Sequence, residues 1–385
     1  MLWRREVVVG IAGLLLALYT LAFAGRVAAL AGNGWLDANH LPFGGDFVCF
    51  WSAARLALEG RAADAFDPSV LQPVQQAAIP GSEARFLWNY PPTFLLVLAP
   101  FGLLGAVAAT WAWWATTVPL YLAALLQVVP RWETLVLAGA GSAGLLALAH
   151  GQNGFLLTAI LVGGLAQLDR GRPVLAGAIL GALVIKPHLG VLLPVALAAS
   201  GSWRAFAATG VSAGVACLAT LLAFGASSWA AFVANLASVQ GGIDAGVFPA
   251  EKLVTPYVLL RTLGASGASA TVGQGICTLG VAAIVGWTSW RLGRRPLAWA
   301  VLIVGTTLAS PYLFDYDLVL LAGAFAFAWV DPSPWGPGER VLWGLAALLP
   351  VAFVALYGVF GVQAAPLLLF ALLASLAARG VATDT

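Results

Sequence analysis

The chain has 385 residues, of which 61% are hydrophobic and only 9% are charged. Soluble domains carry roughly 25% charged residues, so this composition excludes a soluble globular domain and indicates a protein that uses lipid as its solvent. The net charge of +2 comes from scattered Lys and Arg, without the basic tract that a nucleic-acid partner requires. We expect one all-α polytopic membrane domain over residues 1–385.

The first predicted element is an uncleaved membrane helix. Arg4 and Arg5 precede an apolar run from Val7 that is longer than the ~7–15 residues of a signal-peptide core. Eleven further apolar runs, each bounded by Gly, Pro or charge, predict about twelve spans in total. The runs cover 7–30, 93–128, 134–149, 153–169, 173–185, 189–199, 205–224, 268–290, 297–310, 316–330, 341–357 and 363–378.

The run 93–128 is too long for one straight span and is interrupted by Pro100 and Gly102. It is either one kinked span or a hairpin, whereas several other runs are shorter than the ~20 residues that cross a bilayer. Cytoplasmic loops retain Lys and Arg, and one crossing by 93–128 satisfies this rule with both chain ends inside. The inside connections then hold Arg131, Arg170, Arg172, Arg204, Arg291, Arg294, Arg295, Arg340 and Arg379.

Two long loops, 31–92 and 225–267, lie outside in this topology, and each contains an apolar stripe at helical spacing. Such helices lie along a membrane surface, and we expect them to cover a cavity. The stripes are Phe47, Phe50, Trp51, Ala54 and Leu58 in the first loop, and Trp229, Phe232, Val233 and Leu236 in the second.

Polar residues outside the linkers gather on the same predicted outer face. Polar groups are costly near lipid, so their convergence from five separate segments predicts a functional site. They are Asp46; Asn89 and Tyr90; His150, Gln152 and Asn153; Lys186 and His188; and Tyr312, Asp315, Tyr316 and Asp317.

Simpler roles stay open for each of these residues. Asp46 precedes a predicted helix and is a good N-cap residue. Lys186 ends an apolar run and is suited to reach the interface with its ammonium group. The other open roles are a connecting turn for Gln152, a solvated loop for Asp315 and Asp317, and packing for His150 and His188.

No catalytic or metal motif of known spacing is present, and Cys49, Cys217 and Cys277 form an odd set without paired spacing. We therefore expect no disulfide framework, no cofactor and no metal.

The order of short motifs resembles glycosyltransferase family 87 over nearly the whole chain. No single motif is specific, and the resemblance depends on their common order. The motifs are Gly45-Asp46-Phe47, Trp51-Ser52-Ala53-Ala54-Arg55, Phe66-Asp67-Pro68, Tyr90-Pro91-Pro92, Gly151-Gln152, Arg170-Gly171-Arg172-Pro173, Lys186-Pro187, Trp203-Arg204 and Ser310-Pro311-Tyr312.

This resemblance implies a GT-C type fold in the inner (plasma) membrane and a polyprenyl-phosphate sugar donor, which is polyprenyl-phosphate mannose in the mycobacterial members that make α-1,2 linkages. It also implies that Asp46, the carboxylate of the first loop, is the general base. Phe50 and Trp51 replace a Tyr-like aromatic, Gly154 follows Asn153, and Phe314-Asp315-Tyr316-Asp317 replaces a Trp-Asp-His-His type run, so the sugar and the acceptor stay open.

The expected reaction is an inverting transfer of a hexose to a lipid or glycan acceptor on the extracytoplasmic face. A cation should stabilise the departing phosphate, and Lys186 is favoured over His188. The residues expected to bind the sugar or the acceptor are Tyr90, Asn89, Gln152, Asn153, Tyr312, Asp315 and Asp317.

Two other classes of function remain. A secondary transporter or lipid-linked sugar flippase predicts polar groups at the bilayer midplane and pseudo-symmetric halves, neither of which the sequence indicates. A periplasmic glycan ligase or polymerase uses a diphosphate donor, for which Arg-rich outer loops are expected.

Overall fold

The structure is a computed structural model that describes residues 5–381. Within this range every regular element is a helix, and strand-like pairing is limited to the isolated bridges Leu36–Pro42 and Leu253–Phe314. The predicted all-α class is therefore confirmed. The predicted first helix is α1 (Arg5–Gly32), and Arg4 lies outside the described residues.

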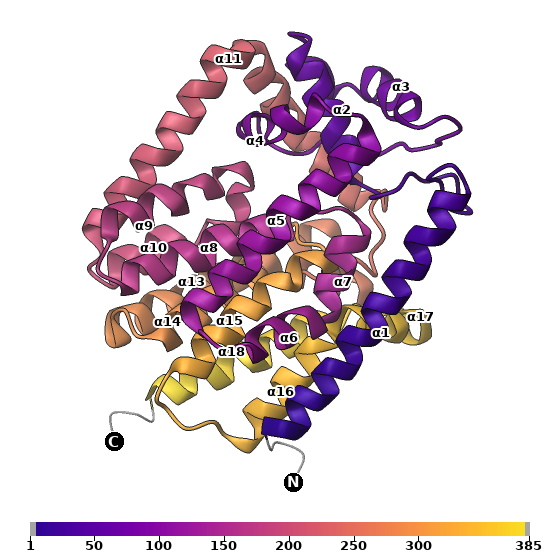
Figure 1. Ribbon diagram of the computed structural model, residues 1–385. Coiled ribbons are helices and arrows are strands. Elements are labelled where there is room, and N and C mark those ends of the chain that lie inside the picture. Colours follow the sequence, from indigo (N-terminus) through magenta and orange to yellow (C-terminus); the bar gives the residue numbers. More distant parts are fainter. Residues whose placement is uncertain (1–4, 382–385) are drawn as a thin grey trace.

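Figure 1 shows how the chain ends lie relative to the first long loop. The start of α1 and the end of α18 (Ala365–Val381) lie at one end of the molecule. The helices α2 (Phe47–Leu58) and α3 (Pro68–Ala78) lie at the opposite end, joined by the 3₁₀ helix η1 (Ala62–Phe66). This arrangement agrees with a loop on the far side from both chain ends.

Several helices have the length and composition of membrane spans. α1, α11 (Trp203–Asp244) and α13 (Gly267–Leu292) qualify singly, and two bent helix pairs qualify if each pair counts as one span. Leu14, Leu18 and Leu21 of α1 are all more than half exposed, an arrangement that needs lipid around it. The protein is therefore a helical membrane protein, and the number of twelve crossings stays a prediction.

The long run 93–128, for which the sequence left one kinked span or a hairpin open, is sharply bent, and the preference for a single crossing stays a prediction. It forms α4 (Thr93–Gly102) and α5 (Ala106–Val128), which are inclined at 120° to each other. The short α4 packs against α2, while α5 alone is about 34 Å long at 1.5 Å per residue. Only α5 therefore has the length to cross the hydrocarbon core.

Other apolar runs are also interrupted. The run 134–149 divides at the extended residue Gly141 into α6 (Glu133–Ala140) and α7 (Ser142–Ala149), and 341–357 divides into α16 (Pro337–Ala347) and α17 (Leu349–Phe360), bent by 81°. The segments 173–185 and 189–199 mix α and 3₁₀ helix. They form α9 (Pro173–Leu180), η2 (Gly181–Ile185), η3 (Pro187–Leu189) and α10 (Leu193–Ala199).

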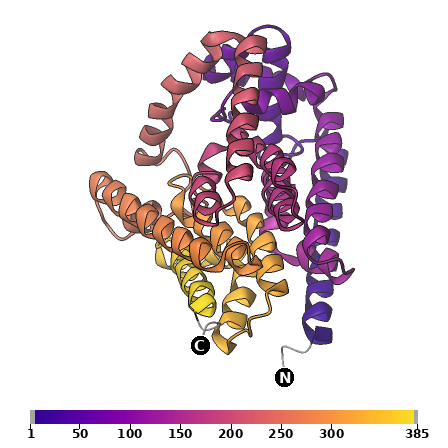
Figure 2. The ribbon, with the colours of Figure 1, turned by 90° about the vertical axis from the view of Figure 1, so that its left-hand side faces the viewer.

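The helix expected in the second long loop is present, but it continues from the preceding apolar run. α11 has 42 residues and breaks at Gly225, whose φ of 75° and ψ of 164° lie outside the helical region. Figure 2 shows the ribbon turning back after this break. The second part of α11, which contains Phe232 and Leu236, therefore runs back toward the rest of the molecule.

The centre of the molecule is α14 (Pro296–Ala309), in which every side chain from Leu297 to Ala309 is buried. Helices α13, α15 (Leu321–Val330) and α18 pack around it. The chain also forms α8 (Gly154–Asp169), α12 (Pro256–Thr262) and the 3₁₀ helix η4 (Asp315–Leu320).

Candidate active site

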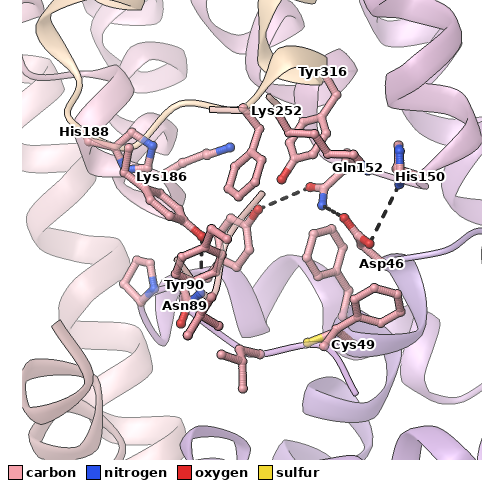
Figure 3. A pocket seen from close by; sticks show the side chains of 18 of the residues that line it. Asp46, Cys49, Asn89, Tyr90, His150, Gln152, Lys186, His188, Lys252 and Tyr316 are labelled. Atoms are coloured by element: carbon pink, nitrogen blue, oxygen red, sulfur yellow. Dashed lines mark hydrogen bonds and ion pairs between the residues drawn. The ribbon is translucent and has the colours of Figure 1, made fainter. Parts of the chain in front are cut away.

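The polar segments that we expected to converge surround one cavity of about 450 Å³, which Figure 3 shows from close by. Side chains of the second part of α11 also line it, in agreement with the predicted cover. Seven of the ten predicted site residues line the cavity: Asp46, Asn89, Tyr90, Gln152, Lys186, His188 and Tyr312.

Glycine positions bring the first loop against the turn between α7 and α8. Gly44 and Gly45 have φ values of +81° and +53°, which residues with a side chain adopt rarely. Gly151 also has a positive φ, and a Cβ atom there would lie 2.5 Å from the carbonyl oxygen of Gly44. This close backbone approach places Asp46 beside Gln152.

The Asp46 carboxylate does not cap α2, so the simpler interpretation of this residue is wrong. Its side chain makes no capping hydrogen bond, although its position is the N-cap of the helix. Instead, Nε2 of Gln152 donates to Oδ2 of Asp46 at 2.6 Å, and Nδ1 of His150 lies 3.9 Å from Oδ1. The carboxylate therefore faces the cavity with hydrogen-bonding capacity to spare.

Gln152 is held in one orientation by neighbours on both sides. The Tyr90 hydroxyl donates to Oε1 of Gln152 at 3.3 Å, and the Trp113 indole donates to its backbone carbonyl at 3.4 Å. Because Oε1 accepts from Tyr90, the amide nitrogen points to Asp46. A chain of polar contacts thus runs from Tyr90 through Gln152 to Asp46.

Lys186 lies on the other side of the cavity, together with His188 (Figure 3). The Lys186 side chain is only 3% exposed, and Nζ lies 2.6 Å from Oδ1 of Asp317. The ammonium group also lies 5.8 Å from the ring centres of Tyr90 and Tyr316. Lys186 is therefore a buried, paired cation at the site, and the interpretation as an interfacial anchor is wrong.

Three predicted site residues, Asn153, Asp315 and Asp317, are buried and do not line the cavity. Asp317 also accepts from the backbone N–H of Phe314 at 3.2 Å. Burial raises the pKa of Asp315 to about 6. A solvated loop at these two carboxylates is therefore excluded.

Asn153 is fully buried beside the Tyr90 hydroxyl. Its interaction with the hydroxyl lowers the pKa of Tyr90 against a larger increase from burial. Neither polar atom of its amide, however, reaches hydrogen-bond geometry with any described residue. A fully buried amide without such partners is rare in folded proteins.

The two histidines of the site favour the neutral form. Burial lowers the pKa of His150, and burial together with the nearby Lys186 lowers the pKa of His188 to about 3. The His188 ring lies 6.0 Å from the ring of Tyr312, and its buried Nε2 has no hydrogen-bond partner among the described residues. His188 can therefore offer a hydrogen bond but not a positive charge near pH 7.

A second polar chain links α11 to the site. Nδ2 of Asn235 donates to Oδ1 of Asn89 at 3.1 Å, and Nδ2 of Asn89 donates to the Tyr312 hydroxyl at 3.3 Å. These bonds tie the part of α11 beyond Gly225 to the cavity wall.

Several lining residues were missed by the sequence analysis. Lys252 and Arg85 add positive charge, although neither belongs to a motif or an amphipathic stripe. Another part of the wall is apolar and joins Phe232 and Leu236 of the predicted stripe to residues outside it; Leu236 is 51% and Val247 is 61% exposed. The apolar residues of this wall include Phe86, Leu87, Phe232, Leu236, Val247 and Phe248.

The fold and the site together define a helical membrane protein with a cavity that combines a carboxylate, cations and an apolar wall. Residues 88–311 match the family described as Glycosyltransferase family 87. The chain belongs to this family and is a glycosyltransferase, which acts on a sugar donor and an acceptor.

The matched region includes Asn89, Gln152 and Lys186, whereas Asp46 and Tyr312 lie outside it. No curated protein and no solved structure matches the chain.

Proposed function

We propose that this protein transfers a hexose, most simply mannose, from a polyprenyl-phosphate sugar to a lipid or glycan acceptor. The observation that carries the proposal is the Asp46 carboxylate, which faces a cavity whose opposite side holds Lys186 and His188 (Figure 3). The apolar wall beside these polar groups suits a substrate with a lipid chain and a charged head. We further propose that the helices form a GT-C type fold.

Asp46 is the proposed general base. It takes the proton of the acceptor hydroxyl as that oxygen forms a bond to the anomeric carbon. The bond between the anomeric carbon and the phosphate oxygen breaks, and its electron pair leaves with the polyprenyl phosphate. A single displacement inverts the anomeric centre, so a β-linked donor yields an α-linked product.

Lys186 and His188 are proposed to contact the donor phosphate. Charge-assisted hydrogen bonds to phosphate oxygens are strong and stabilise charge that develops in the transition state. Lys186 is held for this role by Asp317 at 2.6 Å. His188 supplies a neutral hydrogen bond from its buried ring.

The remaining polar residues are assigned by their distance from the cavity. Tyr90, Asn89 and Gln152 are proposed to bind sugar hydroxyls, and Tyr312 the acceptor, because all four line the wall. The buried residues then act through these neighbours, rather than by direct contact with the acceptor. These supporting residues are Asn153 behind Tyr90, Asp317 behind Lys186, and Asp315 beside Lys252.

The site is proposed to face the extracytoplasmic side of the inner (plasma) membrane. The start of α1 and the end of α18 lie at the opposite end of the molecule from α2 (Figure 1), and the Arg distribution favours these two chain ends inside. We propose that the two long loops, 31–92 and 225–267, cover the substrates on the outer face.

The test is transfer of labelled sugar by the purified protein in lipid vesicles. The donors compared are polyprenyl-phosphate mannose, polyprenyl-phosphate glucose and a polyprenyl-diphosphate sugar, each with a mixed lipid and glycan acceptor fraction. Label should leave a monophosphate donor and appear in the acceptor. Transfer from the diphosphate donor alone would instead support a ligase, and movement of intact donor across the vesicle without transfer would support a flippase.

A further inference from the structure

Two lysines line the cavity, and their surroundings differ. Lys186 lies 2.6 Å from Asp317, so its charge is already balanced by a buried carboxylate. The ammonium group of Lys252 makes no ion pair and no hydrogen bond with any described side chain or backbone group of residues 5–381. The cavity therefore contains one lysine in a short ion pair and one without, and Arg85 adds a second cation without an ion pair among the described residues.

The backbone of Lys252 is fixed next to the late loop. Its carbonyl accepts from the N–H of Asp315 at 2.8 Å, and its own N–H donates to Pro249 at 3.1 Å. The next residue, Leu253, forms a backbone bridge with Phe314. Lys252 thus projects from an anchored segment, although it belongs to a loop of more than forty residues in the predicted topology.

The charge of Lys252 also affects titratable groups on two different sides of the site. It lowers the pKa of Asp315 against the larger increase caused by burial, and it contributes to the lowered pKa of His150. Since His150 lies beside Asp46, the ammonium group acts between the carboxylate side and the late loop. This is where the reacting end of a bound donor would lie.

The proposed reaction moves one negative charge from Asp46, which is neutralised by the acceptor's proton, to the departing phosphate. The donor is a phosphodiester with a single negative charge, and the departing phosphate monoester gains a second as the bond to the sugar breaks. A phosphate monoester has a second pKa near ~6 and carries close to two charges at pH 7. The paired Lys186 and Asp317 have no net charge to offset this change.

We propose that Lys252 binds the phosphate of the donor and stabilises the charge of the departing polyprenyl phosphate. Lys252 then supplies the net positive charge, and Lys186 supplies orientation and a hydrogen bond. The assignment rests on the proposed function, because it presumes a lipid-phosphate leaving group.

The test compares two competitors of donor binding, a short-chain isoprenyl phosphate and the corresponding isoprenol. They share the lipid chain and differ in the phosphate. In Lys252→Gln, the phosphate should compete about 10-fold to 100-fold more weakly, as expected for the loss of a charged hydrogen bond, while the isoprenol competes as in the parent. Turnover should fall by roughly 10²-fold, the typical effect of removing one preorganised donor.

Two variants complete the test. Lys252→Arg keeps the charge and should restore most of the phosphate competition. Arg261→Gln is the matched control, because Arg261 lies in the same predicted loop, donates to the Ala265 carbonyl and does not line the cavity. It should behave as the parent.

The assignment is overturned if Lys252→Gln weakens competition by the isoprenyl phosphate and by the isoprenol equally, or weakens neither. If the parent itself binds neither the isoprenyl phosphate nor a polyprenyl-phosphate sugar, the proposed function fails and takes this assignment with it. The two failures are therefore distinguishable from the parent protein alone.

Discussion

Replacing Asp46 with Asn separates a base from a structural residue with one change. Asn can still accept the hydrogen bond that Gln152 donates at 2.6 Å, because its side-chain oxygen occupies an equivalent position. Asp46 makes no side-chain cap on α2, so no capping energy is lost. The substitution therefore preserves shape and removes the ability to take a proton.

The structure sets the size of the two expected effects. The Gln152 hydrogen bond changes from charged to neutral, which costs on the order of 1 kcal/mol, and His150 at 3.9 Å is too far to add a strong contact. The loss of general-base catalysis lowers the rate by about 10² to 10⁴, equal to roughly 3–5 kcal/mol of transition-state stabilisation. The catalytic effect should exceed the effect on stability several-fold.

The assay is the rate of sugar transfer in detergent-purified protein, with thermal unfolding and donor binding measured on the same sample. Asp67→Asn is the matched control, because Asp67 precedes α3 in the same loop and accepts from the N–H of Ser69 as a true N-cap. It should leave the rate within a few fold, since Asn and Asp cap about equally well. An Asp46→Asn protein with an equally small change would refute the base assignment.

Three further predictions follow from the described contacts. Lys186→Ala should destabilise the protein by about 3–5 kcal/mol in thermal unfolding, because it leaves the buried Asp317 without its ion pair. The double variant with Asp317→Ala should regain stability but not sugar transfer. A Lys186→Ala protein as stable as the parent would contradict this. In a background without the three native cysteines, a membrane-impermeant maleimide added outside cells should label the exposed position of Ala77→Cys but not that of Pro334→Cys, and the reverse pattern would overturn the topology. Because burial raises the pKa of Asp315 from 3.8 to about 6, its folded form binds the proton more tightly, so this group's contribution to stability is full below about pH 4 and falls until about pH 6. Asp315→Asn should remove that fall, and parallel stability–pH curves for parent and variant would count against it.

The clustering of the site could be predicted because polar side chains are costly near lipid, so the few in an apolar chain tend to lie together away from it. Lys186 directly follows an apolar run, Gln152 lies between two runs, and Tyr90 precedes one. Asp46 precedes the first apolar stripe, and the structure brings all four residues to one cavity. Lys252 could not be found in this way. It lies in a loop where a lysine is ordinary, and only the bridge between Leu253 and Phe314 reveals its position.

The breaks within apolar runs were also beyond the sequence analysis. Hydropathy counts apolar residues and does not detect where the backbone leaves helical geometry, so Gly141 was read as part of a continuous run. Pro100 and Gly102 correctly indicated an interruption near the start of 93–128. The 120° bend itself depends on the packing of α4 against α2, which joins segments far apart in the chain.

The pairing of charges in the site explains how a carboxylate and two lysines can share one cavity without cancelling one another. An opposite charge beside a carboxylate stabilises its charged form and weakens it as a base. Asp46 instead receives its hydrogen bond from the neutral amide of Gln152, while Lys186 is paired with a different carboxylate, Asp317. Because Tyr90 fixes the direction of the Gln152 amide, the separation is built into the contacts of the site. The base thus stays available to a hydroxyl, and Lys252, which has no ion pair among the described residues, stays available to a phosphate.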